Sequence, residues 1–114
     1  MRRLLLAAML LAVSPVAAGC SSTPPTCASP TVTTTVEMQN STFAPTCISA
    51  TAGQTLTLHN ADTTPHTFTI KGTDVDVKID ASATSEAALS GVAPGTYTVT
   101  CLYHPQMTQT LQVT

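Results

Sequence analysis

The sequence predicts an all-β protein, an antiparallel Greek-key sandwich of seven or eight strands. Short segments alternate apolar and polar residues and are separated by turn-forming residues, which is typical of half-buried strands. Threonine, whose branched side chain favours strands, is abundant, and charged residues make up only 9% of the chain. No segment sustains the periodicity of an amphipathic helix. Several short strands at this spacing indicate a sandwich.

The N-terminus carries the pattern of an export signal. Arg2 and Arg3 form a short basic start, and residues 4–13 are almost uninterruptedly apolar. This run is too short to span a bilayer, and small residues follow it at positions 17–19. Residues 1–19 are therefore predicted to be a removable signal, through either the Sec or the twin-arginine route.

Cys20 directly follows this segment. The run Val16-Ala-Ala-Gly-Cys20 resembles the lipobox of bacterial lipoproteins, with Ala17 where leucine is more usual. That resemblance implies that Cys20 is lipidated and holds the protein on a bacterial membrane, at the cell surface or in the periplasm. The alternative is a secreted protein cleaved near Ala18.

The rest of the chain divides into a tether and one domain. Residues 20–31 combine Cys20 with a Ser/Thr/Pro-rich stretch that has little to bury, and such stretches stay extended. Residues 32–114 are long enough for a single folded domain.

Without Arg2 and Arg3, the chain has two lysines and six carboxylates, which gives a net charge of −4. No basic patch is present, so nucleic acid is not expected as a partner, and a monomer is the expected state.

The strands are predicted from alternation. Residues 32–38 are expected first, then residues 55–60 and 66–70, with weaker segments at 75–80 and 84–89. Residues 91–95 form a turn, and the strand after it leads to Cys101, before a last strand at 108–114. The side chains expected to face inward are Val32, Val36, Met38, Leu56, Leu58, His66, Phe68, Ile70, Tyr97, Val99, Cys101, Leu111 and Val113.

The strongest chemical signal is the run Cys101-Leu-Tyr-His104-Pro-Gln-Met107, between two predicted strands. It supplies a thiolate, an imidazole and a thioether, and His66 supplies a second imidazole at the start of another strand. Two histidines and a cysteine with a weak axial methionine are the ligands of a blue copper site. Zinc is the alternative metal, but a methionine thioether is a poor ligand for zinc. The sequence thus predicts one type 1 copper ion.

At these residues the chain resembles the cupredoxins, most closely the plastocyanin and amicyanin group. The resemblance covers nearly all of residues 32–114. The gap of two residues between His104 and Met107 is similar to that of amicyanin. The other matching positions are Phe43-Ala-Pro45, Ile48, Ala52-Gly53, Leu56, Leu58, Asn60, Asp62, Pro65-His66 and Pro94-Gly95-Thr-Tyr97.

The resemblance implies roles for individual residues. His66, Cys101, His104 and Met107 take the four ligand positions. The ring edge of His104 is expected to reach solvent, and redox partner proteins are expected to dock there on an apolar patch that includes Pro105 and Leu102. Asn60 is expected to anchor the ligand loop through its side chain.

Two positions depart from the family pattern. Thr67 stands where many relatives have asparagine, so it keeps the backbone N–H toward the thiolate but is expected to tether the ligand loop less well. His59 stands where an apolar residue is common. Its side chain lies on the opposite face of the strand from those of Leu56 and Leu58, so it is expected to face solvent rather than bind metal.

The remaining cysteines are expected to pair. If Cys20 is lipidated and Cys101 binds metal, Cys27 and Cys47 are left, and an exported domain folds in an oxidising compartment. A Cys27–Cys47 disulfide is therefore predicted.

Together these features predict a one-electron carrier between extracytoplasmic redox partners. Alternatives are a lipoprotein that sequesters or delivers copper, and an accessory domain of a metal-uptake system. The sequence shows no nucleophilic triad, paired catalytic carboxylates or phosphate-binding loop, so an enzyme is not expected.

Overall fold

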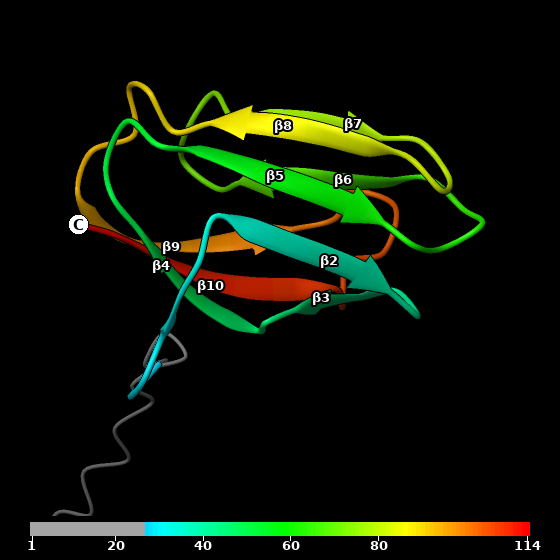
Figure 1. The fold of residues 1–114 in the computed structure, drawn as a ribbon, viewed down its shortest axis with the longest axis horizontal. Helices are drawn as coiled ribbons and strands as arrows, with labels where there is room; N and C mark the ends of the chain where they lie inside the picture. Colours follow the sequence, from blue (N-terminus) through cyan, green and yellow to red (C-terminus); the bar gives the residue numbers. More distant parts are fainter. Residues whose placement is uncertain (1–26) are drawn as a thin grey trace, which may run out of the picture.

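The computed structural model describes residues 27–114. The predicted signal at 1–19, Cys20, and the tether up to residue 26 lie outside the described residues. Within residues 27–114, no helix is long and apolar enough to cross a membrane. This part of the chain is built from ten short strands in two sheets that lie face to face (Figure 1).

The larger sheet has six strands in the order β1-β4-β10-β9-β6-β7. Their bounds are β1 Thr31–Val32, β4 Cys47–Ala50, β10 Thr108–Val113, β9 Gly95–Thr100, β6 His66–Ile70 and β7 Asp76–Ile79. The smaller sheet has the order β3-β2-β5-β8. Its bounds are β3 Thr42–Ala44, β2 Thr35–Gln39, β5 Thr55–Asn60 and β8 Thr84–Ala88.

The predicted all-β sandwich is confirmed, with differences in detail. The sheets are mixed, because β1 and β10 pair with β4 in parallel and β2 pairs with β5 in parallel. The described chain has ten strands rather than seven or eight, because β1, β3 and β4 are too short for a readable alternation. The two strands of a parallel pair are remote in sequence, so the alternation of apolar and polar residues within one strand does not predict the pairing.

Val32 does not face the core, contrary to the prediction. Its side chain is 84% exposed, whereas Val36 and Met38 are fully buried. The predicted strand at 32–38 is in fact two strands in different sheets, β1 beside β4 and β2 beside β5. Since the chain crosses between sheets at residues 33–34, the alternation of β2 does not extend back to Val32.

The core fills the space between the sheets. Phe43 of β3 and Phe68 of β6 meet edge to face with ring centroids 6.0 Å apart, which joins the smaller sheet to the larger one. The predicted inward residues Leu56, Leu58 and Ile70 are fully buried. Truncating a buried phenylalanine to alanine costs about 3–5 kcal/mol, so these contacts also fix the position of β6.

The strands that frame the candidate site meet at one end of the sandwich. β6 begins at His66 and runs antiparallel to β9, with Thr69 opposite Thr100. The start of β6 therefore lies beside the end of β9. Figure 1 shows the loop before β6 and the loop between β9 and β10 at the same end of the molecule.

Candidate metal centre

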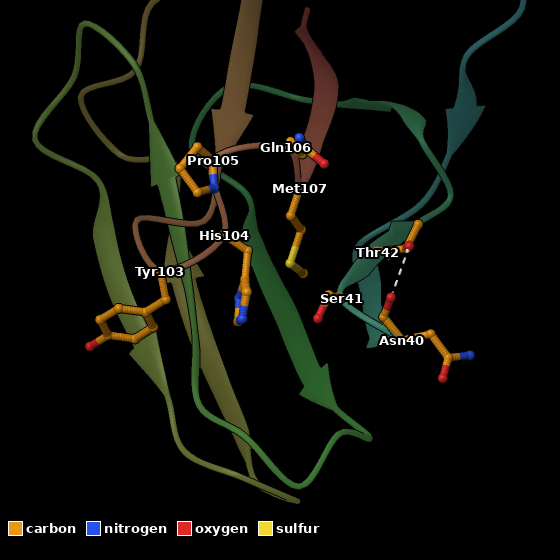
Figure 2. Close-up of a pocket in the computed structure, with 8 residues that line it drawn as sticks. All are labelled: Asn40, Ser41, Thr42, Tyr103, His104, Pro105, Gln106 and Met107. Carbon is orange, nitrogen blue, oxygen red and sulfur yellow. Dashed lines mark hydrogen bonds between the residues drawn. The ribbon is translucent and has the colours of Figure 1, made fainter.

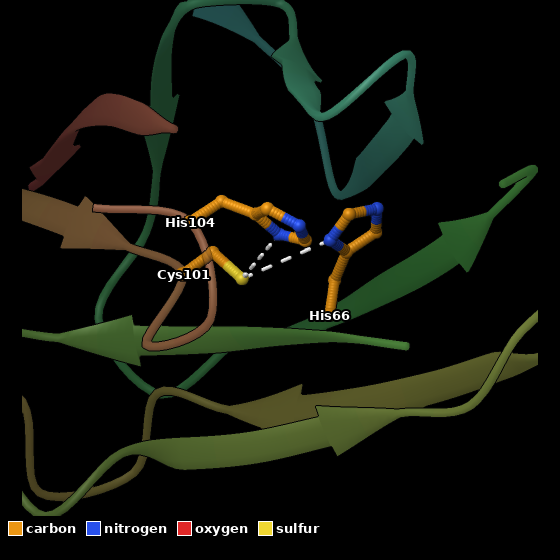
Figure 3. Close-up of side chains that lie close together, drawn as sticks. All are labelled: His66, Cys101 and His104. Atoms are coloured by element: carbon orange, nitrogen blue, oxygen red, sulfur yellow. Dashed lines mark hydrogen bonds between the residues drawn. The ribbon is translucent and has the colours of Figure 1, made fainter. Parts of the chain in front are cut away.

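Three potential ligand atoms converge at this end of the sandwich. The Sγ atom of Cys101 lies 3.7 Å from Nδ1 of His66 and 3.6 Å from Nδ1 of His104. Figure 3 shows both rings turned toward the sulfur, His66 from β6 and the other two from the loop after β9. All three ligand atoms lie within 4.8 Å of one another.

These separations fit a single trigonal metal ion. With the bond lengths known for zinc sites, about 2.0–2.1 Å to nitrogen and 2.3 Å to sulfur, two bonds set about 120° apart separate nitrogen and sulfur by about 3.8 Å. The observed separations of 3.7 and 3.6 Å are close to this value. One thiolate and two imidazoles are also the planar donor set that blue copper sites use. The residues present therefore fit a copper ion.

Met107 belongs to the same loop. Its side chain is only 3% exposed. Figure 2 shows it extending from the loop in the same direction as the His104 ring, and both residues line one pocket. The backbone N–H of Met107 donates to the carbonyl of His104 at 2.8 Å, and that of Cys101 donates to the carbonyl of Met107 at 3.2 Å. These bonds close the loop between Cys101 and Met107 into a compact turn.

The surroundings of Cys101 favour its thiolate. Burial alone raises the pKa of this thiol, since its side chain is 1% exposed. The backbone N–H of Thr67, 3.4 Å from the sulfur, acts against burial together with His104 and the backbone N–H of Tyr103, and the pKa falls to about 6 from an ordinary 9.0. The thiolate is the form that binds metal.

Thr67 also reaches the ligand loop through its side chain. Its Oγ1 accepts a hydrogen bond of 2.8 Å from the backbone N–H of Leu102. Thr67 therefore tethers the ligand loop through its hydroxyl, in addition to the contact of its backbone N–H with the thiolate.

Asn60 organises the loop that leads into His66. Fully buried, it donates from Nδ2 to the carbonyls of Thr64, Ile79 and Asp80 at 2.8, 3.3 and 3.1 Å. Its Oδ1 accepts from the backbone N–H of Asp62 at 3.0 Å. The side chain thus holds the loop before His66 against the end of β7.

Asp62, a residue to which the sequence analysis gave no role, contacts the buried ligand histidine. Its Oδ2 lies 2.8 Å from Nε2 of His66. The backbone N–H of Ser41 is the largest cause that lowers the pKa of Asp62 below its usual value, and His66 and the N–H of Asn40 lower it further. In the sequence, the only sign of this role is that a carboxylate stands four residues before a predicted histidine ligand.

The surface around the site is partly apolar. His66 is fully buried and His104 is half-buried. Leu102 and Tyr103 are 58% and 51% exposed, and Pro105 is exposed beside them. His59, in contrast, lies away from this cluster on β5, with Nδ1 2.9 Å from both carboxylate oxygens of Glu37 and a side chain 44% exposed. Its expected surface position is confirmed.

The structure also joins Cys27 to Cys47 through a disulfide. Among the described residues, Cys101 is then the cysteine that remains free. Residues 27–31, assigned to the tether from sequence, are held against the domain by this bond and by the pairing of Thr31 with Ile48.

Comparisons with known proteins agree with this architecture. The family model of the cupredoxin-like domain matches residues 3–113. A mutant of amicyanin in the reduced Cu(I) form at pH 4 is 18% identical, with a TM-score of 0.58 over 70% of this chain and 80% of that chain. A methionine-to-glutamine mutant of amicyanin with Cu(I) is 18% identical, with a TM-score of 0.59 over 73% of this chain and 82% of that chain.

A larger protein shares the same fold. The copper-containing nitrite reductase from Thermus scotoductus SA-01 is 20% identical, with a TM-score of 0.60 over 70% of this chain, but only 22% of that chain is covered. No curated protein sequence matches the chain significantly. At these identities the solved structures share the fold, and the family model covers nearly the whole chain. The chain therefore belongs to the cupredoxin-like domain family.

Proposed function

We propose that the chain is a one-electron carrier that holds one type 1 copper ion between His66, Cys101, His104 and Met107. The observation that carries this proposal is the convergence of two imidazole nitrogens and one thiolate sulfur within 4.8 Å. Bound copper supplies the change between Cu(I) and Cu(II). The protein residues supply soft sulfur ligands that suit Cu(I) and imidazoles that also suit Cu(II).

The rigidity of the ligand set supports electron transfer. His66 is fixed at the start of a buried strand, and the 101–107 loop is closed by its own backbone hydrogen bonds and by Thr67. A site held in one arrangement accepts either oxidation state with little movement of its ligands, which is what fast exchange of an electron requires.

Electrons enter and leave through His104. It is the half-buried histidine of the pair, whereas His66 is fully enclosed. The exposed side chains of Leu102, Tyr103 and Pro105 surround it with an apolar surface on which a redox partner protein docks. Tyr103 extends the patch that the sequence predicted from Leu102 and Pro105.

We place the protein outside the cytoplasm, held on a bacterial membrane through lipidated Cys20. A disulfide between Cys27 and Cys47 is in keeping with an oxidising compartment. The role is transfer of electrons rather than conversion of a substrate. The nitrite reductase shares only 22% of its length with this chain, so its activity is not carried over.

The first test is the absorption and electron paramagnetic resonance spectrum of the protein after stoichiometric addition of Cu(II). An intense blue thiolate-to-copper band with narrow hyperfine splitting is expected, and Cys101→Ser should abolish it. A colourless wild-type complex, or a band that survives Cys101→Ser, contradicts the proposal. Slow loss of Cu(I) to a mild chelator is expected of a carrier, whereas rapid loss favours copper delivery.

A further inference from the structure

The ring of His66 is held at both of its nitrogens. Nδ1 faces the sulfur of Cys101 at 3.7 Å, and Nε2 lies 2.8 Å from Oδ2 of Asp62. The histidine side chain is fully buried, and that of Asp62 is 16% exposed. The contact is therefore largely shielded from water, where a charge-assisted hydrogen bond is stronger than at the surface.

The carboxylate of Asp62 is itself held in place. Oδ1 accepts from the backbone N–H of Asn40 at 2.7 Å, and Oδ2 accepts from that of Ser41 at 2.9 Å. Asn40 and Ser41 form the two-residue turn between β2 and β3, with positive φ angles of 53° and 54°. Successive backbone N–H groups in a turn form a concavity that binds an anionic group. The backbone of Asp62 is fixed by Asn60 and Ser82.

This arrangement selects one form of the His66 ring. A carboxylate only accepts hydrogen bonds, so Nε2 of His66 must carry the proton. In the neutral ring Nδ1 then bears the lone pair, and Nδ1 is the nitrogen that faces Cys101 and His104. A carboxylate bound to the outer nitrogen of a metal-ligating histidine also makes that histidine a stronger donor.

We propose that Asp62 is a positioning residue for His66, which fixes the tautomer of its ring and lowers the reduction potential of the bound copper. This inference rests on the proposed copper-binding function. The negative charge and the stronger imidazole donor both favour Cu(II) over Cu(I), because the more highly charged ion gains more from each. The chain thereby sets its potential from the β2–β3 hairpin, an element that supplies none of the four ligands.

The test compares Asp62→Asn with Asp74→Asn. Asparagine keeps an acceptor oxygen at position 62 but removes the charge. Asp74 is an exposed carboxylate in the turn between β6 and β7, at the opposite end of β6 from His66. Removal of such an outer partner typically changes metal affinity 10–100-fold. We expect Asp62→Asn to lower the ratio of Cu(II) to Cu(I) affinity about tenfold, which raises the potential by about 59 mV. Asp74→Asn should leave the ratio unchanged.

A second readout needs no metal. Nitrogen NMR of the metal-free protein, above the ordinary pKa of histidine, should show His66 with its proton on Nε2. Asp62→Ala should convert this ring to a mixture of tautomers. A wild-type ring with its proton on Nδ1 overturns the proposal, and so does an unchanged potential in Asp62→Asn. A role confined to loop stability would lower the melting temperature of the variants without moving either readout.

The outcomes separate this inference from the proposed function. A wild-type protein without the blue band refutes the copper carrier, and the tautomer of His66 then still decides whether Asp62 orients the ring. A blue wild type whose potential equals that of Asp62→Asn refutes the inference alone. If Asp62→Ala does not fold, the inference is decided by the tautomer of His66 in the wild type and by the reduction potential of Asp62→Asn.

Discussion

The hydroxyl oxygen of Thr67 accepts the backbone N–H of Leu102 at 2.8 Å and thereby joins β6 to the ligand loop. Thr69 Oγ1 donates to Asp76 at 2.9 Å and lies 3.0 Å from Thr67 Oγ1. Because the one hydroxyl proton of Thr69 is directed to Asp76, Thr67 must donate to Thr69. The hydrogen bonds therefore run in one direction, from Leu102 through Thr67 and Thr69 to Asp76.

Replacing Thr67 with valine tests this connection. Thr67→Val keeps the shape and the backbone N–H toward Cys101 but removes the acceptor for Leu102. We expect the free energy of unfolding of the metal-free protein to fall by about 1–2 kcal/mol, as measured by chemical denaturation. Thr67→Ser, which retains the hydroxyl, is the control and should lose less. Equal stability of the valine variant and the wild type would show that the hydroxyl contributes nothing.

Met107→Leu separates the thioether from the other ligands. Leucine is similar in volume to methionine, so the unfolding free energy should change by less than about 1.5 kcal/mol. The blue band should remain, because Cys101 and both histidines are intact, while the reduction potential rises since the axial sulfur donor is lost. Voltammetry of the copper-loaded protein measures this. A lowered potential, or loss of the blue band, would exclude an axial role for Met107.

The low pKa of Cys101 makes the stability of the metal-free protein depend on pH. The thiol has a pKa of about 6 when folded and an ordinary value of 9.0. Between these values the unfolded chain binds more protons, so folding becomes more favourable as pH rises from 6 to 9. The contribution is complete above 9 and is lost as pH falls through 6. Denaturation across this range measures the slope.

Cys101→Ser is the matched control for this pH dependence. Serine does not ionise in the range, so its slope should be smaller than that of the wild type. Thiolate absorbance in the ultraviolet should appear with a midpoint near pH 6 in the wild type. A midpoint near the ordinary value would mean that the hydrogen bonds from Thr67, Tyr103 and His104 do not offset burial.

The disulfide between Cys27 and Cys47 should stabilise the domain without affecting the ligands. It closes a loop with a sequence separation of 20 residues, for which the chain-entropy model gives about 3 kcal/mol. Replacing both cysteines with serine should lower the unfolding free energy by about that amount and leave the copper spectrum unchanged. Reduced wild type should match the double variant. Equal stability with and without the bond would contradict this.

Lipidation of Cys20 is tested by cell fractionation. Cys20→Ala should move the protein from the membrane fraction to the soluble extracytoplasmic fraction, because no lipid can be attached at that position. Cys27→Ala, which also removes a cysteine, should leave membrane retention unchanged. Continued retention of Cys20→Ala would refute the anchor.

The sequence by itself determined the all-β class and the order of the candidate ligands. Strands β5 and β6 were predicted with the bounds observed, since each alternates in period two over five or six residues. The run from Cys101 to Met107 lies within one loop, so its thiolate, imidazole and thioether were bound to be neighbours. His66 lies 35 residues from Cys101, so no local spacing links the two. It was predicted as the second imidazole from its place at the start of a strand, and the resemblance gave it a ligand position.

Tertiary structure alone decided how the ligands are supported and where the chain changes sheets. Val32 leaves the core because β1 pairs with β4, a contact between segments remote in sequence. Asp62 meets His66, and Thr67 meets Leu102, through hydrogen bonds of 2.8 Å that depend on the direction of individual atoms. Hydrophobic alternation reports which face of a strand is buried, and carries no information on the orientation of a polar side chain. Alternation therefore predicted the sandwich, and the fold supplied the contacts that orient its ligands.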